Sequence, residues 1–433
     1  MRAEIISIGD ELTSGQRLDT NSQWLSQRLC ELGVAVMFHT TVADDLEANL
    51  AAVRQAVERV DVVIATGGLG PTADDLTREV LAKLTGKELV LNETALEHIR
   101  SLFANRHRDM PERNVVQALF PAGSQMIDNP HGTAPGIAIQ VERAGGGTAQ
   151  VYALPGVPAE MMEMWQASVA PDLIRLGAGK RIIRHRAIRC FGVGESHLEQ
   201  MLPDLIRRGR TPSVGITVSN ATITLRITAE GASPDECATA IEPTVATIRE
   251  CLGDIMFGEE EDELEHSVGR LLTARGETLS TVEWGTAGLI AHWLGEAKES
   301  RDCWLGGAVV HTEEAAARWF EDAGNAGLET PEEQPAPLDW RNAPAQAVEK
   351  LALWFLRRTA SDWVLAVGPF PEDDPQSAQP GQWHCAVARA APEPSVKCAA
   401  FTFAGHPAIL KPRAGKQALN LLRLEVLAKA PAV

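Results

Sequence analysis

The chain has 433 residues, of which 45% are hydrophobic and 23% are charged, and this balance predicts a soluble globular protein of two or three domains. Its formal net charge of −18 argues against nucleic acid as a partner, because an extended nucleic-acid interface needs a basic surface. A local pocket for a phosphorylated small molecule remains compatible with that charge. The seven scattered cysteines contain no CxxC pair, so neither a zinc knuckle nor a disulfide framework is indicated.

The N-terminus leads directly into a strand-like run, which is not the pattern of a secretory signal peptide. No apolar stretch approaches the roughly 18–20 residues that a membrane helix requires. We therefore expect a cytoplasmic protein without a membrane partner.

The first part of the chain alternates strand-like and helix-like segments. Short β-rich runs at residues 3–9, 34–42 and 61–66 are separated by segments at 21–33 and 44–60 whose apolar residues recur at helical spacing. Alternating units of this length predict an α/β sandwich with a parallel sheet and right-handed crossovers.

A glycine-rich segment, ATGGLGPTADDLTRE, follows the third of these runs. We expect a helix to begin near Thr72, with Thr72 and Asp75 as a variant of the capping box. Backbone N–H groups and a helix N-terminus at the end of a parallel strand form a phosphate site. The residues assigned to this phosphate site are Gly67, Gly68, Gly70, Pro71 and Thr72.

Two carboxylates beside a phosphate would repel it unless a divalent cation lay between them. Asp74 and Asp75 are therefore predicted to bind a metal ion of the magnesium type. The alternative is that Asp75 only caps a helix and that the glycines only form a turn.

Three further segments carry similar patterns where strands are expected to end, at residues 9–25, 129–136 and 154–161. Each alone is compatible with ordinary turn chemistry, but four such segments together favour a ligand site. The residues assigned to nucleotide binding from these segments are Asp10, Asn21, Gly132, Pro135 and Gly136.

The four segments GDELTSGQRLDTNSQWL, TGGLGPTADDLT, NPHGTAPG and LPGVPAEM resemble the motifs of the CinA (competence/damage-inducible) family. The resemblance covers residues 1–170 and implies a three-layer sandwich like those of MoaB and MogA, the molybdopterin-binding domains. In some members this domain hydrolyses ADP-ribose with a divalent metal. The resemblance therefore implies an ADP-ribose-like nucleotide as partner, Mg²⁺, Mn²⁺ or Co²⁺ as cofactor, and a homodimer.

Two catalytic aspartates are carried over from the molybdopterin enzymes by this resemblance. Asp75 matches the aspartate of their glycine loop, and Asp44 matches their second functional aspartate, with Asp45 as the adjacent alternative. The loop departs from theirs at Leu69, where they have threonine, and at Pro71. Adenylation of molybdopterin is therefore less favoured than ADP-ribose or another nucleotide as the ligand.

The middle region, residues 171–262, is similar to the KH-like segment of the same family and is expected to be a small α+β linker domain. A helix is predicted at residues 197–209 and a strand at 221–231. An RNA-binding KH module would carry a GxxG loop with basic neighbours, which this segment lacks. We therefore expect a structural role for it.

The third region, residues 263–433, carries eight of the ten tryptophans. It resembles the family's C-terminal α/β domain, a nicotinamide-mononucleotide deamidase with a serine nucleophile. Trp284 stands at the position of the serine. Thr286 matches the family motif and fixes the alignment of this segment with it. In a second motif His311 replaces tyrosine and Ala316 replaces lysine. Because indole is no nucleophile and a methyl group is no base, this domain is predicted to be inactive.

Two Pro-rich acidic stretches of this region, at residues 329–340 and 369–382, are expected to be surface loops. Three functions remain open for the whole chain. They are a metal-dependent ADP-ribose pyrophosphatase, an active deamidase, and a non-catalytic protein that binds nucleotides or takes part in interactions.

Overall fold

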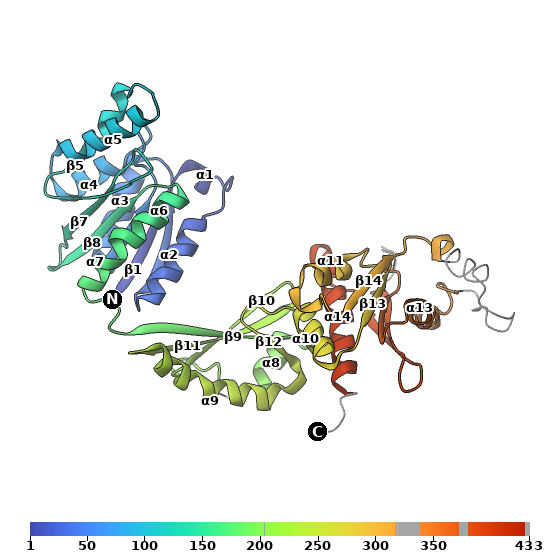
Figure 1. The fold of residues 1–433 in the computed structure, drawn as a ribbon. Helices are drawn as coiled ribbons and strands as arrows, with labels where there is room; N and C mark the ends of the chain where they lie inside the picture. Colours follow the sequence, from blue (N-terminus) through green and yellow to red (C-terminus); the bar gives the residue numbers. More distant parts are fainter. Residues whose placement is uncertain (203, 317, 319–337, 372–379, 429–433) are drawn as a thin grey trace. The chain divides into compact units, whose positions relative to one another are not determined.

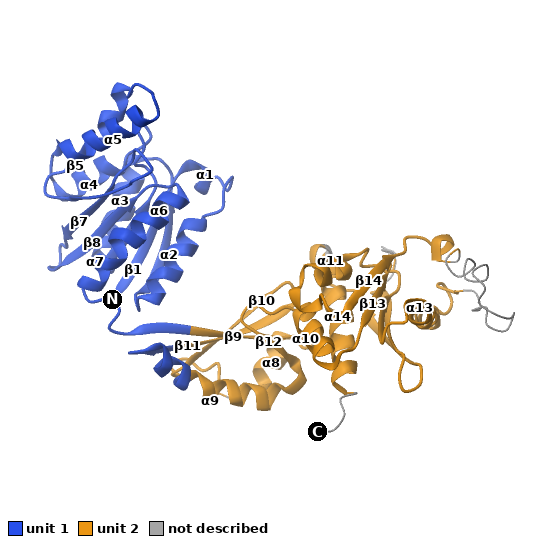
Figure 2. Cartoon of the chain, viewed as in Figure 1, with its two compact units in different colours: residues 1–184, 229–240 blue, residues 185–228, 241–433 orange. Residues whose placement is uncertain are grey.

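The computed structural model describes residues 1–202, 204–316, 318, 338–371 and 380–428, and Figure 1 labels their helices and strands. The chain divides into two compact units. One comprises Met1–Arg184 with Ala229–Ala240, and the other comprises His185–Thr228 with Ile241–Val433 (Figure 2). The three domain ranges expected from the sequence stay a prediction.

The first unit is built on a six-stranded sheet with the strand order β2-β1-β3-β8-β7-β6. Four strands of this sheet are parallel, namely β1 (Arg2–Ile8), β2 (Ala35–Val42), β3 (Val62–Thr66) and β8 (Thr148–Leu154). The remaining two are antiparallel to their neighbours, namely β7 (Gly136–Glu142) and β6 (Gln125–Ile127). Every residue of the central strand β3 is buried, as the near-continuous apolar run in its sequence predicts.

Helices cover both faces of this sheet. Successive side chains of a strand point to opposite faces, and in this sheet both faces carry apolar side chains that must be buried. Ile5 and Ile64 belong to one core cluster and Ile6 and Val63 to another. On the first face lie α2 (Thr20–Glu31), α6 (Pro158–Met164) and α7 (Ala170–Arg175). On the second lie α3 (Leu46–Arg59), α4 (Thr77–Thr85) and α5 (Glu93–Asn105). The predicted three-layer MoaB/MogA-like α/β sandwich is confirmed.

The helix after the glycine-rich segment begins later than expected. α4 starts at Thr77, and its N-cap residue Leu76 makes no side-chain cap. The prediction of a helix start near Thr72 was wrong, because the Asp75 carboxylate accepts N–H groups of the turn before it. Thr72 and Asp75 thus close a turn of the loop and do not cap a helix.

The described residues of the middle region form a four-stranded sheet in the order β10-β11-β9-β12 and two α-helices, the α+β composition expected for the KH-like segment. Its strands are β9 (Ile182–Cys190), β10 (Ser213–Ser219), β11 (Thr222–Gly231) and β12 (Met256–Glu259), and its helices are α8 (Glu195–Met201) and α9 (Pro234–Leu252). The helix predicted at residues 197–209 was wrong in its end, because α8 stops at Met201. The proline at position 203 disfavours a helical conformation of the residue before it.

The C-terminal region has a five-stranded sheet in the order β14-β13-β15-β16-β17. Parallel pairing joins β13 (Leu279–Glu283) to β14 (Trp304–Val309) and to β15 (Trp363–Val367), and antiparallel pairing adds β16 (Gln382–Arg389) and β17 (Ser395–Thr402). One face packs on α10 (Leu264–Arg275), α11 (Leu289–Glu296) and α14 (Pro407–Ala428), and the other on α13 (Pro344–Thr359). Most of the two stretches expected to be surface loops lies outside the described residues.

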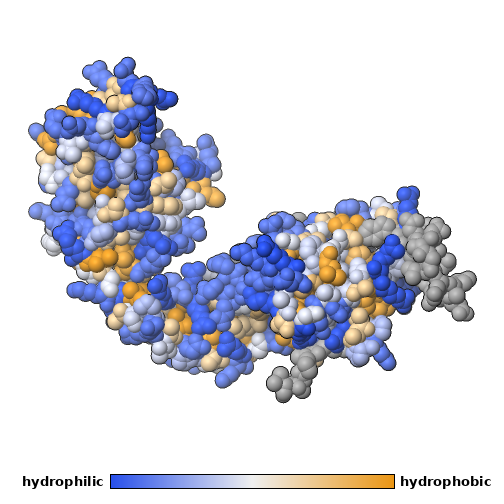
Figure 3. Space-filling view, viewed as in Figure 1, coloured by the Kyte–Doolittle hydropathy of each residue, from blue (hydrophilic) through white to orange (hydrophobic). Residues whose placement is uncertain are grey.

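A buried lysine joins the C-terminal region to the middle one within the second unit. The Nζ atom of Lys416, on α14, donates to Thr222 Oγ1 at 2.6 Å and to Glu263 Oε2 at 2.8 Å. The view in Figure 3 shows that hydrophilic residues cover most of the visible surface, with apolar residues scattered among them. Within the described ranges, no helix is long and apolar enough to cross a membrane.

Candidate functional site

A cleft of about 370 Å³ opens where the parallel strands β1, β3 and β8 end. Ligands of open α/β sheets bind at this edge, beyond the carboxyl ends of the strands. Six chain segments that are separated in the sequence contribute to it. The polar and glycine residues that line this cleft are Gly9, Glu11, Arg17, Asp44, Gly67, Gly68, Gly70, Asp74, Asp75, Gln117, Thr133, Gly156 and Glu160.

The loop at residues 67–70, here called the glycine loop, has its first two carbonyls fixed by Thr77. The hydroxyl of Thr77 donates to the carbonyl of Gly67 at 2.9 Å, and its N–H donates to that of Gly68 at 3.1 Å. Thr77 itself is buried in the first turn of α4. The loop is therefore anchored to the helix that follows it.

The other two carbonyls of the glycine loop are held by a buried arginine. Arg78, which is 2% exposed, donates to the carbonyls of Leu69 and Gly70, and Gln117 donates to that of Leu69 as well. Burial lowers the pKa of Arg78 to about 10, while the charge of Asp75 raises it, so the guanidinium keeps its charge at neutral pH. A buried positive charge thus lies directly against the loop.

The N–H groups of the glycine loop differ from its carbonyls, because not all of them are hydrogen-bonded. Those of Gly68 and Leu69 donate to no protein acceptor in the part of the chain that the structure describes. Gly68 has φ +64°, and a Cβ built on it would lie 2.4 Å from the Thr77 hydroxyl. Glycine is therefore required there by the packing of the loop on α4, a cause that the sequence alone did not reveal. Two backbone donors remain for an anion.

Asp75 holds the loop closed from the cleft side. Its carboxylate accepts the N–H of Gly70 at 2.7 Å and the N–H of Thr72 at 2.9 Å, and it also accepts the Thr72 hydroxyl. Only one of these donors binds Oδ1, so that oxygen keeps a lone pair for a ligand or a cation. Its assignment as a catalytic and metal-binding residue stays a prediction, alongside this positioning role.

Asp44 lies among other carboxylates at the mouth of the same cleft. Its Oδ2 accepts the N–H of Asp10 at 3.0 Å, and its own N–H donates to Asp10 Oδ1 at 3.1 Å. Burial raises the pKa of the Asp44 carboxyl, and the charges of Asp10, Asp74 and Glu11 raise it further. Clustered negative charges of this kind are relieved by a cation or by a proton.

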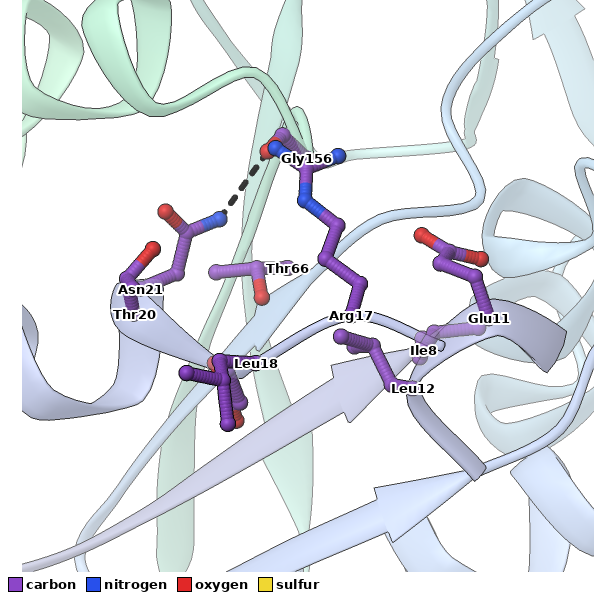
Figure 4. A pocket seen from close by; sticks show the side chains of 10 residues that line it. Ile8, Glu11, Leu12, Arg17, Leu18, Thr20, Asn21, Thr66 and Gly156 are labelled. Carbon is purple, nitrogen blue, oxygen red and sulfur yellow. Dashed lines mark hydrogen bonds between the residues drawn. The ribbon is translucent and has the colours of Figure 1, made fainter. Parts of the chain in front are cut away.

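A smaller hollow adjoins the cleft and shares four of its residues, Ile8, Glu11, Arg17 and Gly156 (Figure 4). Asn21, in the first turn of α2, donates through Nδ2 to the carbonyl of Gly156 at 3.0 Å. Leu12, Leu18, Asp19, Thr20 and Thr66 complete the lining. In Figure 4 the side chain of Arg17 extends from its loop toward Gly156.

Most of the residues assigned from the sequence meet at these two hollows. Asp44, Asp74, Asp75, Gly67, Gly68, Gly70 and Pro71 line the cleft, and Asn21 lines the smaller hollow. Asp10 and Thr72 instead contact the lining residues Asp44 and Asp75. Gly132, Pro135 and Gly136 are buried beside the cleft, where Thr133 and Ala134 of the same segment form the lining.

Sequence reasoning missed several lining residues, among them the four residues Glu11, Arg17, Gly156 and Glu160. All four belong to segments that had been singled out, but nothing in the local pattern distinguishes them from solvent-exposed neighbours. Glu160 accepts the Nδ2 of Asn129 at 2.7 Å, a contact across 31 residues that no local pattern predicts.

The carboxylate oxygens of the cleft suit a divalent cation that takes its remaining ligands from a substrate. No group of three or more His, Cys, Asp or Glu side chains capable of holding a metal occurs among the described residues. Mg²⁺ commonly binds through one or two carboxylates and completes its coordination with phosphate oxygens and water. Asp74, which is exposed, and the free lone pair of Asp75 match that mode of binding.

In the C-terminal region, the end of β13 corresponds to the end of β3. Side chains of the protein itself occupy the space beyond it. Glu283, at the end of β13, is buried and accepts the Thr286 hydroxyl at 2.6 Å and the N–H groups of Ile290 and Ala291 at 3.0 and 2.8 Å. The ring of Trp284 packs edge-on against Trp340, with their centroids 5.1 Å apart.

The second motif of this region offers no basic side chain at the position expected for one. Ala316 is 1% exposed and belongs to the core cluster on the α13 face of the sheet. His311 is exposed. The methyl group at position 316 is thus part of the packing of this face.

Three family models match successive parts of the chain. Residues 4–175 match a family model described as "Probable molybdopterin binding domain", residues 185–258 match the damage-inducible protein CinA KH domain, and residues 261–426 match the CinA C-terminal domain.

A CinA-like protein of Dictyoglomus thermophilum is 41% identical over 318 residues, which are 73% of this chain and 76% of that protein. A protein of Caldicellulosiruptor bescii named as competence-damage inducible is 34% identical over 99% of this chain and 100% of its own length. A crystal structure of CinA from Thermoplasma acidophilum is 34% identical, with a TM-score of 0.36, and covers 39% of this chain and 96% of that chain.

Proposed function

Because the chain belongs to the CinA family, we propose that its N-terminal domain is a divalent-metal-dependent ADP-ribose pyrophosphatase. The observation that carries the proposal is the glycine loop. Its four carbonyls are bound by Thr77, Arg78 and Gln117, while the N–H groups of Gly68 and Leu69 remain for phosphate. Carboxylates that attract a cation lie beside these donors.

In the proposed reaction water adds across the phosphate–phosphate linkage and yields AMP and ribose 5-phosphate. A divalent cation bound by Asp74 and Asp75 would supply the positive charge that neutralises the phosphates. The glycine loop binds and orients the pyrophosphate. Asp44 is the proposed general base, because burial and its acidic neighbours raise its pKa and make its carboxylate a stronger base for the attacking water.

The test is hydrolysis of ADP-ribose by the purified full chain with Mg²⁺, Mn²⁺ or Co²⁺, and with a chelator as control. Formation of AMP and ribose 5-phosphate in equal amounts, lost on chelation, supports the proposal. If none of the three cations gives these products, the catalytic assignment fails. Binding of ADP-ribose without turnover would then favour the non-catalytic alternative.

We also propose that the C-terminal domain does not deamidate nicotinamide mononucleotide. The position that the family motif gives to the nucleophile holds Trp284, which packs against Trp340. The position of the lysine holds Ala316, which packs in the core. Release of ammonia from nicotinamide mononucleotide by the unmodified chain, above a no-protein control, would overturn this assignment and restore the deamidase alternative.

A further inference from the structure

Arg17 lies at the junction between the cleft and the smaller hollow and is the one cationic side chain in the described lining of both. A polyanionic substrate entering there meets strong repulsion, because carboxylates dominate the lining. These carboxylates are Glu11, Asp19, Asp44, Asp74, Asp75 and Glu160. Arg17 is therefore well placed to offset part of that repulsion.

The guanidinium of Arg17 has no ion-pair or hydrogen-bond partner among the described residues. Of the ion pairs formed by the described residues, none includes Arg17, although Glu11 lines the same two hollows. Its backbone N–H donates to the carbonyl of Glu11 at 3.0 Å, which fixes the loop from which the side chain extends. An unpaired guanidinium presents a planar fork of donors that suits phosphate oxygens.

We propose that Arg17 binds a phosphate group of the substrate at this junction and thereby determines specificity. The phosphates then lie in the middle of the bound substrate, between the glycine loop and Arg17. The group esterified to that phosphate enters the smaller hollow. The proposal rests on the proposed function only for the choice of a phosphorylated substrate.

The lining of the smaller hollow indicates which kind of group follows the phosphate. Leu12 and Leu18 supply apolar surface, while Thr20 and Asn21 supply polar atoms. The carboxylate of Asp19 disfavours a further phosphate there. A sugar combines apolar faces with hydroxyl groups and is bonded directly to the phosphate in a sugar phosphate, so the group that enters the smaller hollow is a sugar.

The first experiment measures the affinity for inorganic pyrophosphate by calorimetry, with Mg²⁺ and separately with a chelator. We expect Arg17→Ala to weaken binding about tenfold or more, as loss of a charge-assisted hydrogen bond does, and Arg17→Lys to retain part of the affinity. Arg54→Ala, which removes an exposed arginine of α3 away from both hollows, is the matched control. If Arg17→Ala binds pyrophosphate within about twofold of the unmodified chain, the proposal is overturned.

The second experiment fills the smaller hollow by Thr20→Trp. We expect the affinity for ADP-ribose to fall about tenfold or more, while that for pyrophosphate, which carries no sugar, changes by less than about twofold. Equal effects on both ligands, or an effect on neither, would contradict the placement of the sugar. Retained pyrophosphate binding also shows that the variant is folded.

Failure of this inference can be told apart from failure of the proposed function. If the unmodified chain hydrolyses ADP-ribose and Arg17→Ala binds pyrophosphate normally, only the role of Arg17 is wrong. If the unmodified chain binds both probes in an Arg17-dependent way without hydrolysis, only the catalytic proposal is wrong. If it binds neither probe, both are wrong.

Discussion

The ends of β3 and β13 occupy equivalent places in two sheets but differ in what surrounds them. Both are buried strands with parallel neighbours on each side, and both lead through a glycine-containing turn into a helix. Beyond β3 lies a cleft where the N–H groups of Gly68 and Leu69 have no acceptor among the described residues. Beyond β13, the carboxylate of Glu283 accepts the first N–H groups of α11 and two indoles pack together.

The difference shows that equivalent strand ends can be open or filled by the protein itself, and that a few side chains decide which. At β13 the chain supplies its own anion, since Glu283 satisfies the donors of the helix N-terminus. At β3 the carboxylate of Asp75 satisfies the donors of Gly70 and Thr72 only. The N–H groups of Gly68 and Leu69 have no acceptor among the described residues, and we propose that they bind a phosphate.

The largest expected effect is loss of hydrolysis on removal of the proposed base. We expect Asp44→Asn to lower kcat for ADP-ribose about 100-fold or more, because general base catalysis contributes factors of that order. The matched control is Asp45→Asn, since Asp45 caps α3 by accepting the N–H of Ala48 at 2.8 Å and asparagine caps equally well. Equal losses in both variants would show that the assignment of Asp44 is wrong.

Replacement of Glu283, the buried carboxylate at the end of β13, is expected to destabilise the C-terminal region. Glu283→Ala leaves the Thr286 hydroxyl and the N–H groups of Ile290 and Ala291 buried without an acceptor, at a cost of about 3 kcal/mol. Urea unfolding, compared with Glu296→Ala at the exposed end of α11, measures this cost. A loss no larger than that of the control would mean that water or another group replaces the carboxylate.

A methyl group on the glycine loop should affect both stability and binding. Gly68→Ala combines strain at φ +64° with a contact of 2.4 Å to Thr77 Oγ1, and we expect a loss of about 2–3 kcal/mol together with weaker pyrophosphate binding. Gly86→Ala has the same strain at φ +65° but no atom within 4 Å, so it should cost only about 1 kcal/mol. Calorimetric unfolding of the two variants separates strain from clash. Equal losses would show that the contact with Thr77 relaxes freely.

The smallest expected effect is a gain of stability that depends on pH. Burial raises the pKa of Glu265, and its Oε2 has no partner in the described structure. The protonated carboxyl is thus favoured by folding, and stability is lost as pH rises through the folded-state pKa. Glu265→Gln should therefore be more stable than the unmodified chain at pH 8 and nearly equal at pH 4. An advantage at pH 4 that vanishes at pH 8 would contradict this sign.

Local patterns were sufficient to predict some parts of the site and insufficient for others. The apolar run of β3 and the glycines after it identify a strand and the turn that follows it, because both depend on neighbouring residues. The start of α4 could not be predicted, since it depends on hydrogen bonds of Asp75 with Gly70 and Thr72.

Contacts between distant segments explain the remaining differences. Arg17 reaches the cleft because its loop lies beside Gly156, which is 139 positions away in the sequence, at the end of another strand. In the same way, nothing in the sequence near Lys416 indicates that it pairs with Glu263 and Thr222. Such contacts follow from the fold and not from the local sequence.

The central claim, that the nucleotide binds beyond β3 and not beyond β13, is tested most directly by hydrogen exchange of the full chain with ADP-ribose and Mg²⁺. We predict slower exchange in peptides that cover residues 67–72 and 10–19, because the free N–H groups of Gly68 and Leu69 then donate to phosphate. Exchange in the peptide that covers residues 283–291 should not change. Protection confined to residues 283–291, with none at 67–72, would contradict the account.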